Sequence, residues 1–119
     1  MIDELSIIIP SLNEEKYLPR LLKSISKQNY KGKLEVIVVD GKSSDNTVKK
    51  AEEYKKSISD LRIVATDKNI GHQRNVGAEK AKYKYLLFLD ADVLLAKNCL
   101  NILRNKTVPE KFVAAALHS

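Results

Sequence analysis

The chain has 119 residues, enough for one domain with a hydrophobic core and short for an α/β enzyme. Hydrophobic residues make up 44% and charged residues 30%, which is typical of a soluble globular protein and excludes a disordered one. No apolar run approaches the roughly 20 residues of a membrane-spanning helix, and acids precede the first apolar run, so we expect no secretory signal. The single cysteine, Cys99, excludes an internal disulfide and indicates a cytoplasmic protein.

The net charge of +6, from 21 basic and 15 acidic residues, has two interpretations. It could attract an anionic partner, such as a nucleotide, a lipid phosphate, a membrane surface or nucleic acid. It could equally be a soluble coat of lysines, which we favour because the basic residues are mostly lysine and form no tight stripe. The aromatic residues do not alternate with them and no nucleic-acid motif is present, so we expect no nucleic-acid partner.

Short β-branched runs alternate with amphipathic segments along the whole chain. The predicted strands are residues 5–9, 34–39, 61–65, 85–89 and 112–117. The predicted helices are residues 18–25, a segment that begins after Ser44 or Asp45 and includes Ile58, residues 75–82 and residues 96–105. Pro10 is expected to end the first strand, and Asn13 to cap the turn after it. This alternation predicts an α/β fold with a mainly parallel sheet and helices on both faces.

Polar or acidic residues follow each of the first four predicted strands. They are the segments 10–14, 40–45, 66–71 and 90–92. Because the carboxyl ends of parallel strands meet at one edge of a sheet, we expect these segments to converge there. The sequence therefore predicts a ligand site at that edge.

Asp90 and Asp92 follow the most apolar strand, in the run YLLFLDADVLL. On an extended segment two such residues project to the same side, where both carboxylates can meet one hard cation. That ion would bridge the phosphates of a nucleotide and offset the charge on a leaving group. The alternative is that Asp90 ends the strand and Asp92 caps the next helix, without a metal.

The second segment, Asp40 to Thr47, reads DGKSSDNT. A buried carboxylate at a strand end can accept hydrogen bonds from a base or a sugar hydroxyl. Gly41 is expected to permit a sharp turn, and the Ser and Asp residues after it to cap a helix. Neither a glycine-rich dinucleotide motif nor a P-loop is present anywhere in the chain.

The third segment, Asn69 to Gly77, places two glycines and Arg74 where a helix is expected to open. Free N–H groups and a guanidinium there suit an anion site. The alternative is an ordinary surface loop with Arg74 in water. His72 and His118 receive no assignment.

Together, the stretches IIIPSLNEEKYLPRLLKSI, VIVVDGKSSDNT and NIGHQRNVGAEKAKYKYLLFLDAD resemble the N-terminal, nucleotide-sugar-binding half of a family 2 glycosyltransferase with the GT-A fold. The resemblance implies transfer of a sugar from a UDP- or GDP-sugar, with inversion, using Mn²⁺ or Mg²⁺. It also implies site residues: Pro10, Ser11 and Glu14 in the nucleoside pocket, Asp40 at the base, Arg74 at the nucleotide, Asp90 at the ribose or sugar, and Asp92 with Asp90 at the metal.

Two segments depart from the family pattern. The second motif of the family commonly reads Asp-Asp-Gly-Ser-x-Asp, so Gly41 replaces its second aspartate and Lys42 its glycine. The loop that leads to Arg74 is also a residue or two shorter than common versions.

Only 27 residues (119 − 92) follow Asp92, and Glu110 is the one acid among them. The later half of family members supplies the acceptor site and a carboxylate base. We therefore expect residues 1–119 to be a single, incomplete GT-A domain, truncated after about five strands and without a catalytic base. Transfer by this chain alone should be feeble or absent, while donor binding survives.

Two other functions fit parts of the pattern. The chain could be a non-catalytic truncated α/β module that forms a homodimer through the apolar edge strand 112–117. A nucleotidyltransferase is disfavoured, because residues 10–14 are not the glycine-rich basic loop that such enzymes carry. The acceptor remains open among a polysaccharide, a protein and a polyprenyl phosphate, and the last of these would bring the chain to a membrane surface.

Overall fold

Five parallel strands form the centre of the protein, in the order β3-β2-β1-β4-β5. The structure is a computed structural model and describes residues 1–106 and 113–114. The strands are β1 (Glu4–Ser11), β2 (Lys33–Asp40), β3 (Leu61–Ala65), β4 (Tyr85–Phe88) and β5 (Val113–Ala114). The expected parallel α/β architecture is thus confirmed. Of the predicted strand 112–117, only β5 falls within the described residues.

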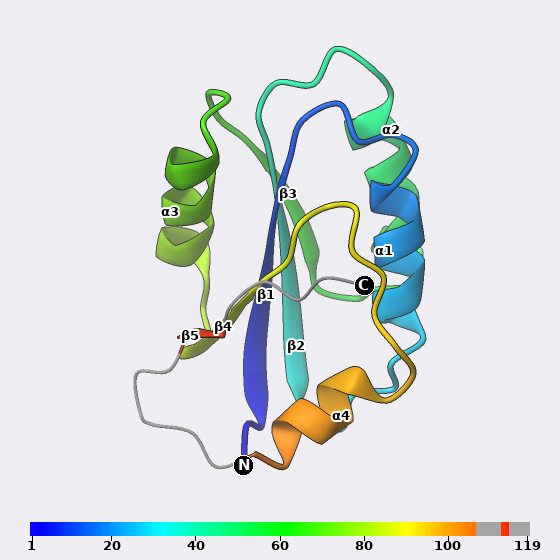
Figure 1. Ribbon diagram of the computed structural model, residues 1–119, viewed down its shortest axis with the longest axis vertical. Coiled ribbons are helices and arrows are strands. Elements are labelled where there is room, and N and C mark those ends of the chain that lie inside the picture. The colour runs from blue at the N-terminus through cyan, green and yellow to red at the C-terminus, as the bar shows by residue number, and fades with distance from the viewer. Residues whose placement is uncertain (107–112, 115–119) are drawn as a thin grey trace.

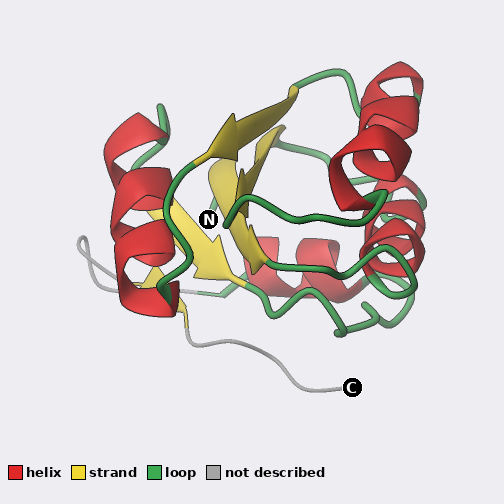
Figure 2. Cartoon of the chain, turned by 90° about the horizontal axis from the view of Figure 1, so that it is seen from above, coloured by secondary structure: helices red, strands yellow, loops and turns green. Residues whose placement is uncertain are grey.

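Helices cover both faces of the sheet, as Figures 1 and 2 show. One face carries α1 (Leu18–Ser26), α2 (Thr47–Glu52), η1 (Glu53–Lys56) and α4 (Cys99–Arg104). On the other face, α3 (Ile70–Lys80) is the one helix among the described residues. Within residues 1–106 and 113–114, no helix combines the length and the apolar character needed to cross a membrane.

The larger core lies between the sheet and α1. The helix buries Leu18, Leu21, Leu22 and Ile25, all at most 2% exposed and spaced as one helical face requires. Burying each such side chain contributes about 1.5–3 kcal/mol. The predicted helix 18–25 is therefore confirmed, and it begins at Leu18 with Pro19 in its first turn.

Pro10 does not end β1, contrary to the prediction. The strand continues to Ser11, and Pro10 pairs with Val39 of β2. On the β4 side the last bond runs from the Leu89 N–H to the Ile8 carbonyl. Because proline has no N–H, Pro10 cannot donate the next bond toward β4. It therefore ends one ladder and leaves the other intact.

Helix α3 begins at Ile70, five residues before the predicted start at Asn75. Asn69 caps it by accepting a hydrogen bond from the His72 N–H at 2.9 Å. Helix α4 is shorter than predicted and begins at Cys99, because Asn98 before it adopts a left-handed conformation with φ of 63°. Helix α2 is also short, since the chain tightens into η1 from Glu53.

A buried carboxylate fixes the connection from α3 to β4. Glu35 of β2 is fully buried and accepts hydrogen bonds from Ser6 Oγ at 2.7 Å, Arg62 Nη2 at 2.6 Å and the Lys82 N–H at 2.9 Å. These partners compensate its desolvation. The arrangement holds the start of β4 beside β1, and so fixes where that strand delivers Asp90.

Gly77 lets α3 approach the sheet closely. A Cβ atom at this position would collide with Ile8 Cγ2 and come within 3.2 Å of Val39 Cγ2, and both side chains are fully buried. Since β-branched side chains in a packed strand cannot move aside cheaply, the helix requires a residue without a side chain here.

We therefore expect Gly77→Ala to lower the free energy of unfolding by about 1–3 kcal/mol, although alanine favours helix. Gly71→Ala in the same helix is the matched control, because its Cβ would meet only Asn69 Oδ1 at 3.5 Å. That variant should be unchanged or more stable by up to about 1 kcal/mol. Urea denaturation measures both, and equal effects of the two substitutions would contradict the close packing.

Candidate functional site

A cleft of ≈ 510 Å³ opens at the carboxyl ends of β1 and β4, beside the start of α3. We call it the rim cleft, and its lining residues are Pro10, Ser11, Leu12, Glu14, Lys68, Asn69, Ile70, Gln73, Asp90, Ala91 and Asp92. Five of the seven predicted site residues therefore meet here: Pro10, Ser11, Glu14, Asp90 and Asp92. Asp40 and Arg74 are not lining residues, but they contact two that are, Ser11 and Asp90 respectively.

Asp90 and Asp92 both face the rim cleft, but not for the reason expected. The chain turns after β4, and the Val93 N–H donates to the Asp90 carbonyl at 3.1 Å, so this segment is not extended. The capping alternative is wrong as well, since α4 begins only at Cys99. Asp90 is half-buried and lies 3.7 Å from Arg74 Nη2, whereas Asp92 is exposed.

The two carboxylates suit a hard divalent cation that also binds other oxygens. Among the described residues, no group of three His, Cys, Asp or Glu side chains is placed to hold a metal ion. Mg²⁺ and related ions commonly take one or two carboxylates from the protein and complete their shell with water and phosphate oxygens. The residues present therefore fit an ion shared with a phosphate-bearing ligand.

Glu14 adds to a concentration of negative charge at this edge. Burial raises the pKa of its carboxyl above the ordinary value, and the charges of Asp92, Asp45 and Asp90 raise the pKa further. No hydrogen bond to this carboxylate occurs within the described part of the chain. A cation in the rim cleft would relieve this repulsion.

Asp40 stabilises the turn that follows β2 by accepting hydrogen bonds. It is buried and accepts hydrogen bonds from the Ser43 N–H at 2.8 Å, from Ser43 Oγ at 2.6 Å and from Ser11 Oγ at 3.3 Å. The turn that it stabilises places Lys42, not Gly41, in the left-handed region, with φ of 62°. Lys42 thus adopts the strained conformation at the position where the family commonly has glycine.

Gln73 of α3 is a site residue that the sequence did not reveal. Its side chain is buried, and Nε2 donates to the Ser11 carbonyl at 3.0 Å and to the Val39 carbonyl at 2.9 Å. Its Oε1 accepts from the Asn69 N–H at 3.2 Å. One amide thus joins the ends of β1 and β2 to the start of α3. Because the helix was predicted to begin at Asn75, nothing in the pattern marked Gln73 as an inward-facing residue.

Arg74 lies in the second turn of α3 and does not open the helix. Its one described ion pair is with Asp90, across from the helix to the end of β4. His72 is exposed and contributes its backbone N–H to the Asn69 cap. The expected anion site around Arg74 stays a prediction, and the structure corrects only its place, which is the second turn of α3 and not the helix start.

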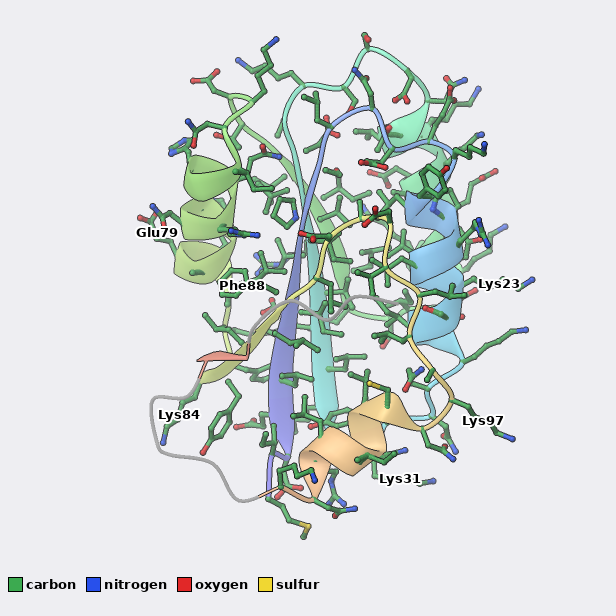
Figure 3. All side chains as sticks on the ribbon, in the orientation of Figure 1. Lys23, Lys31, Glu79, Lys84, Phe88 and Lys97 are labelled. Carbon is green, nitrogen blue, oxygen red and sulfur yellow. The ribbon has the colours of Figure 1, made fainter. Side chains whose placement is uncertain are left out.

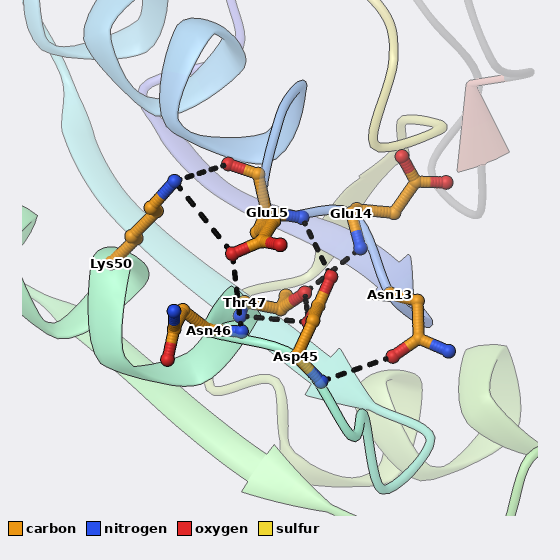
Figure 4. Close-up of polar contacts among 7 residues, drawn as sticks. All are labelled: Asn13, Glu14, Glu15, Asp45, Asn46, Thr47 and Lys50. Carbon is orange, nitrogen blue, oxygen red and sulfur yellow. Dashed lines mark hydrogen bonds and ion pairs between the residues drawn. The ribbon is translucent and has the colours of Figure 1, made fainter.

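The loop after β1 is clamped by the loop after β2 (Figure 4). Consecutive backbone N–H groups of Asn13, Glu14 and Glu15 donate to side-chain oxygens of Ser43, Thr47 and Asp45, at 2.8, 2.8 and 3.3 Å. In return, Oδ1 of Asn13 accepts from the N–H groups of residues 44 and 45. Asn13 therefore serves the neighbouring loop and not its own turn, and the polar cluster holds Glu14 at the rim cleft.

This combination of a parallel sheet, an acidic rim cleft and a clamped first loop defines a GT-A type domain. The sequence matches Glycosyl transferase family 2 over residues 6–116, and the chain belongs to this family.

Curated relatives and solved structures agree with that assignment. Poly(ribitol-phosphate) beta-N-acetylglucosaminyltransferase TarS of Staphylococcus aureus is 36% identical over 99 residues, 80% of this chain and 17% of the relative. Glycosyltransferase AglE of Haloferax volcanii is 37% identical over 90 residues, 73% of this chain and 30% of the relative. The chain thus spans less than a third of the length of either relative.

Two structures of related proteins contain donors. S. aureus TarS 1-349 in complex with UDP-GlcNAc superposes with a TM-score of 0.77 at 35% identity, over 84% of this chain and 30% of that one. The mannosyltransferase PcManGT of Pyrobaculum calidifontis in complex with GDP-Man and Mn²⁺ gives a TM-score of 0.74 at 27% identity, over 86% of this chain and 30% of that one.

Thr47 provides a test of the clamp, because it is fully buried and its hydroxyl receives the Glu14 N–H. Thr47→Val keeps the shape and leaves that N–H unpaired, so we expect a loss of about 1–3 kcal/mol of stability and faster hydrogen exchange of the Glu14 amide. Thr47→Ser keeps the hydroxyl and should leave that exchange rate unchanged. Equal exchange in both variants would show that the Thr47 hydroxyl does not protect the Glu14 amide.

The raised pKa of Glu14 predicts a pH dependence of stability. The folded state holds this proton more tightly than the unfolded chain, so ionisation of Glu14 costs stability as the pH rises from 4.5 through the folded pKa. Glu14→Gln removes that cost, and we expect the variant to be more stable than the wild type at pH 7 but not at pH 4. Urea denaturation at both pH values measures this, and an equal gain at both would refute the ionisation of Glu14 as its cause.

Proposed function

We propose that the rim cleft binds a nucleotide-diphosphate sugar together with Mn²⁺ or Mg²⁺, as the donor site for inverting transfer of that sugar. The observation that carries the proposal is the pair of carboxylates, Asp90 and Asp92, in a cleft that the end of β1 also lines. The related proteins whose structures contain UDP-GlcNAc, or GDP-Man with Mn²⁺, support the choice of ligand.

In this proposal Asp92 and Asp90 would hold the cation, which would supply positive charge against the departing nucleotide diphosphate. Arg74 lies 3.7 Å from Asp90 and both orients that carboxylate and neutralises part of its charge. Pro10, Ser11 and Glu14 form the wall that would face the nucleoside. Asp40 would contact the base of the nucleotide only if its hydrogen bonds with Ser43 were replaced by hydrogen bonds with the ligand.

The proposal assigns donor binding to the rim cleft. It assigns the role of catalytic base to no described residue. The carboxylates that line the rim cleft are taken up by the cation and by the nucleotide. Deprotonation of an acceptor therefore needs a base from elsewhere, and we expect residues 1–119 to act as the donor-binding part of a larger enzyme.

Self-association through a sheet edge stays a second prediction. The prediction concerns the edge strand 112–117, of which only β5 (Val113–Ala114) is described, and β5 is one edge of the sheet. Such an edge offers unpaired backbone groups to a second copy. Sedimentation velocity over a range of concentrations tests it, and a monomer throughout would exclude the dimer.

Donor binding predicts a thermal shift that depends on the metal. UDP or GDP with Mn²⁺ should stabilise the folded chain by about 2.7 kcal/mol at a hundredfold excess over Kd, and raise the Tm accordingly. Asp92→Asn should abolish the part of the shift that requires Mn²⁺. Glu79→Gln is the matched control, because Glu79 is exposed on the outer side of α3 (Figure 3). The absence of a shift with either nucleotide and either metal would overturn the proposal.

A further inference from the structure

A second hollow, of ≈ 660 Å³, lies between the outer side of α1 and the segment before α4. Four cations line it: Arg20, Lys23 and Lys27 from the α1 side, and Lys97 from the other. No carboxylate is among its lining residues. We call this hollow the basic groove.

The four cations of the basic groove make no ion pair with any described residue. Elsewhere in the described chain, Lys50, Lys82 and Arg104 lie within 4 Å of acids, whereas Lys49 and Lys56 make no ion pair; the groove differs in that its four cations line one hollow. An uncompensated group of like charges around one hollow is unfavourable by itself and attracts anions. The lysine coat inferred from the sequence therefore contains a concentrated patch that the linear order concealed.

The other polar side chains of the groove are already satisfied. Gln28 is buried and bonds to the carbonyls of Ser24 and Ala96, at 3.2 and 2.9 Å, and to the Leu100 N–H at 3.0 Å. Ser24 Oγ donates to the Leu21 carbonyl and accepts from the Leu95 N–H. These bonds fix the floor, and the cations remain as the groups that meet a ligand.

The cations are arranged along a line. Arg20, Lys23 and Lys27 are spaced i, i+3 and i+7 on and just beyond α1, which puts them in one row over about 10 Å of helix axis. Figure 3 shows Lys23 and Lys97 projecting on the same side of the molecule. A row of exposed cations matches an extended anion with several charges better than one small phosphate.

The basic groove also connects to the rim cleft. A smaller hollow of ≈ 200 Å³ is lined by Arg20 and Leu94, which belong to the basic groove, and by Asp92, which belongs to the rim cleft. A chain lying in the groove can therefore reach the candidate metal ligand along a continuous surface. Leu94, at 46% exposed, offers an apolar contact on that path.

We propose that the basic groove binds a linear, phosphate-bearing polymer and that this polymer is the acceptor. The acceptor role rests on the proposed donor site, whereas binding of the polymer does not. Nucleic acid fits less well, because no aromatic side chain lines the groove for base stacking. A flat anionic membrane is the other occupant to test, and the concave arrangement of the cations favours the polymer.

Labelled inorganic polyphosphate is the probe, and its binding is measured by fluorescence anisotropy over a series of salt concentrations. The double variant Lys23→Glu with Lys27→Glu should bind at least about tenfold more weakly, with a shallower dependence on salt. Lys49→Glu with Lys56→Glu is the matched control: both lysines are exposed, lie outside the groove and change the net charge equally. Its affinity should fall less than about threefold.

Three further measurements decide the outcome. Lys23→Gln with Lys27→Gln repeats the test without reversing charge, should the glutamate pair fail to fold. Equal losses in the groove and control variants would overturn the proposal, and so would tighter binding to phosphatidylglycerol vesicles that depends on Lys23 and Lys27. The Tm shift with UDP and Mn²⁺ should persist in the groove variants; polymer binding without any such shift would refute the donor site alone.

Discussion

The parallel pairing of β1 with both β2 and β4 is the constraint on which the candidate site depends. Because β1 lies in the middle of the sheet and all three strands run the same way, their carboxyl ends meet at one edge. The apolar side chains of these strands have no other place to be buried, so the polar residues that follow them emerge together. Glu35, at the opposite end of the sheet, secures this register by holding the approach to β4.

Parallel strands leave backbone groups to be satisfied where the strands end, and this chain uses side chains for that purpose. The side-chain amide of Gln73 donates to carbonyls at the ends of two strands. Side-chain oxygens of Ser43, Thr47 and Asp45 accept hydrogen bonds from three consecutive N–H groups of the first loop. Since these partners are buried or fixed in short segments, the loops around the rim cleft are held before any ligand arrives. Such pre-organisation lowers the entropy that binding must overcome.

The sequence predicted the parts of the fold that depend on burial, and it missed those that depend on close backbone approach. Four strands and α1 follow from apolar periodicity, and the acids after β1 and β4 follow from strand order. Helix α3 was placed too late because Gly77 and Gln73, not an apolar stripe, form its inner face. The left-handed Lys42 could not be foreseen, since only the folded loop shows that Lys42, and not Gly41 beside it, has a positive φ.

The distribution of charge links the two proposed sites by a single physical argument. The rim cleft is acidic in a chain whose net charge is +6, so its carboxylates repel one another and a polyphosphate as well until a cation is bound. The basic groove has the opposite character and needs no metal to attract phosphate. A donor diphosphate would therefore enter only with its cation. A phosphate-bearing acceptor would be held by Arg20 and the lysines without a metal, and would be repelled from a rim cleft that holds no cation. The shared border at Asp92, Arg20 and Leu94 is where the two fields meet, and where a bound cation would let the acceptor approach.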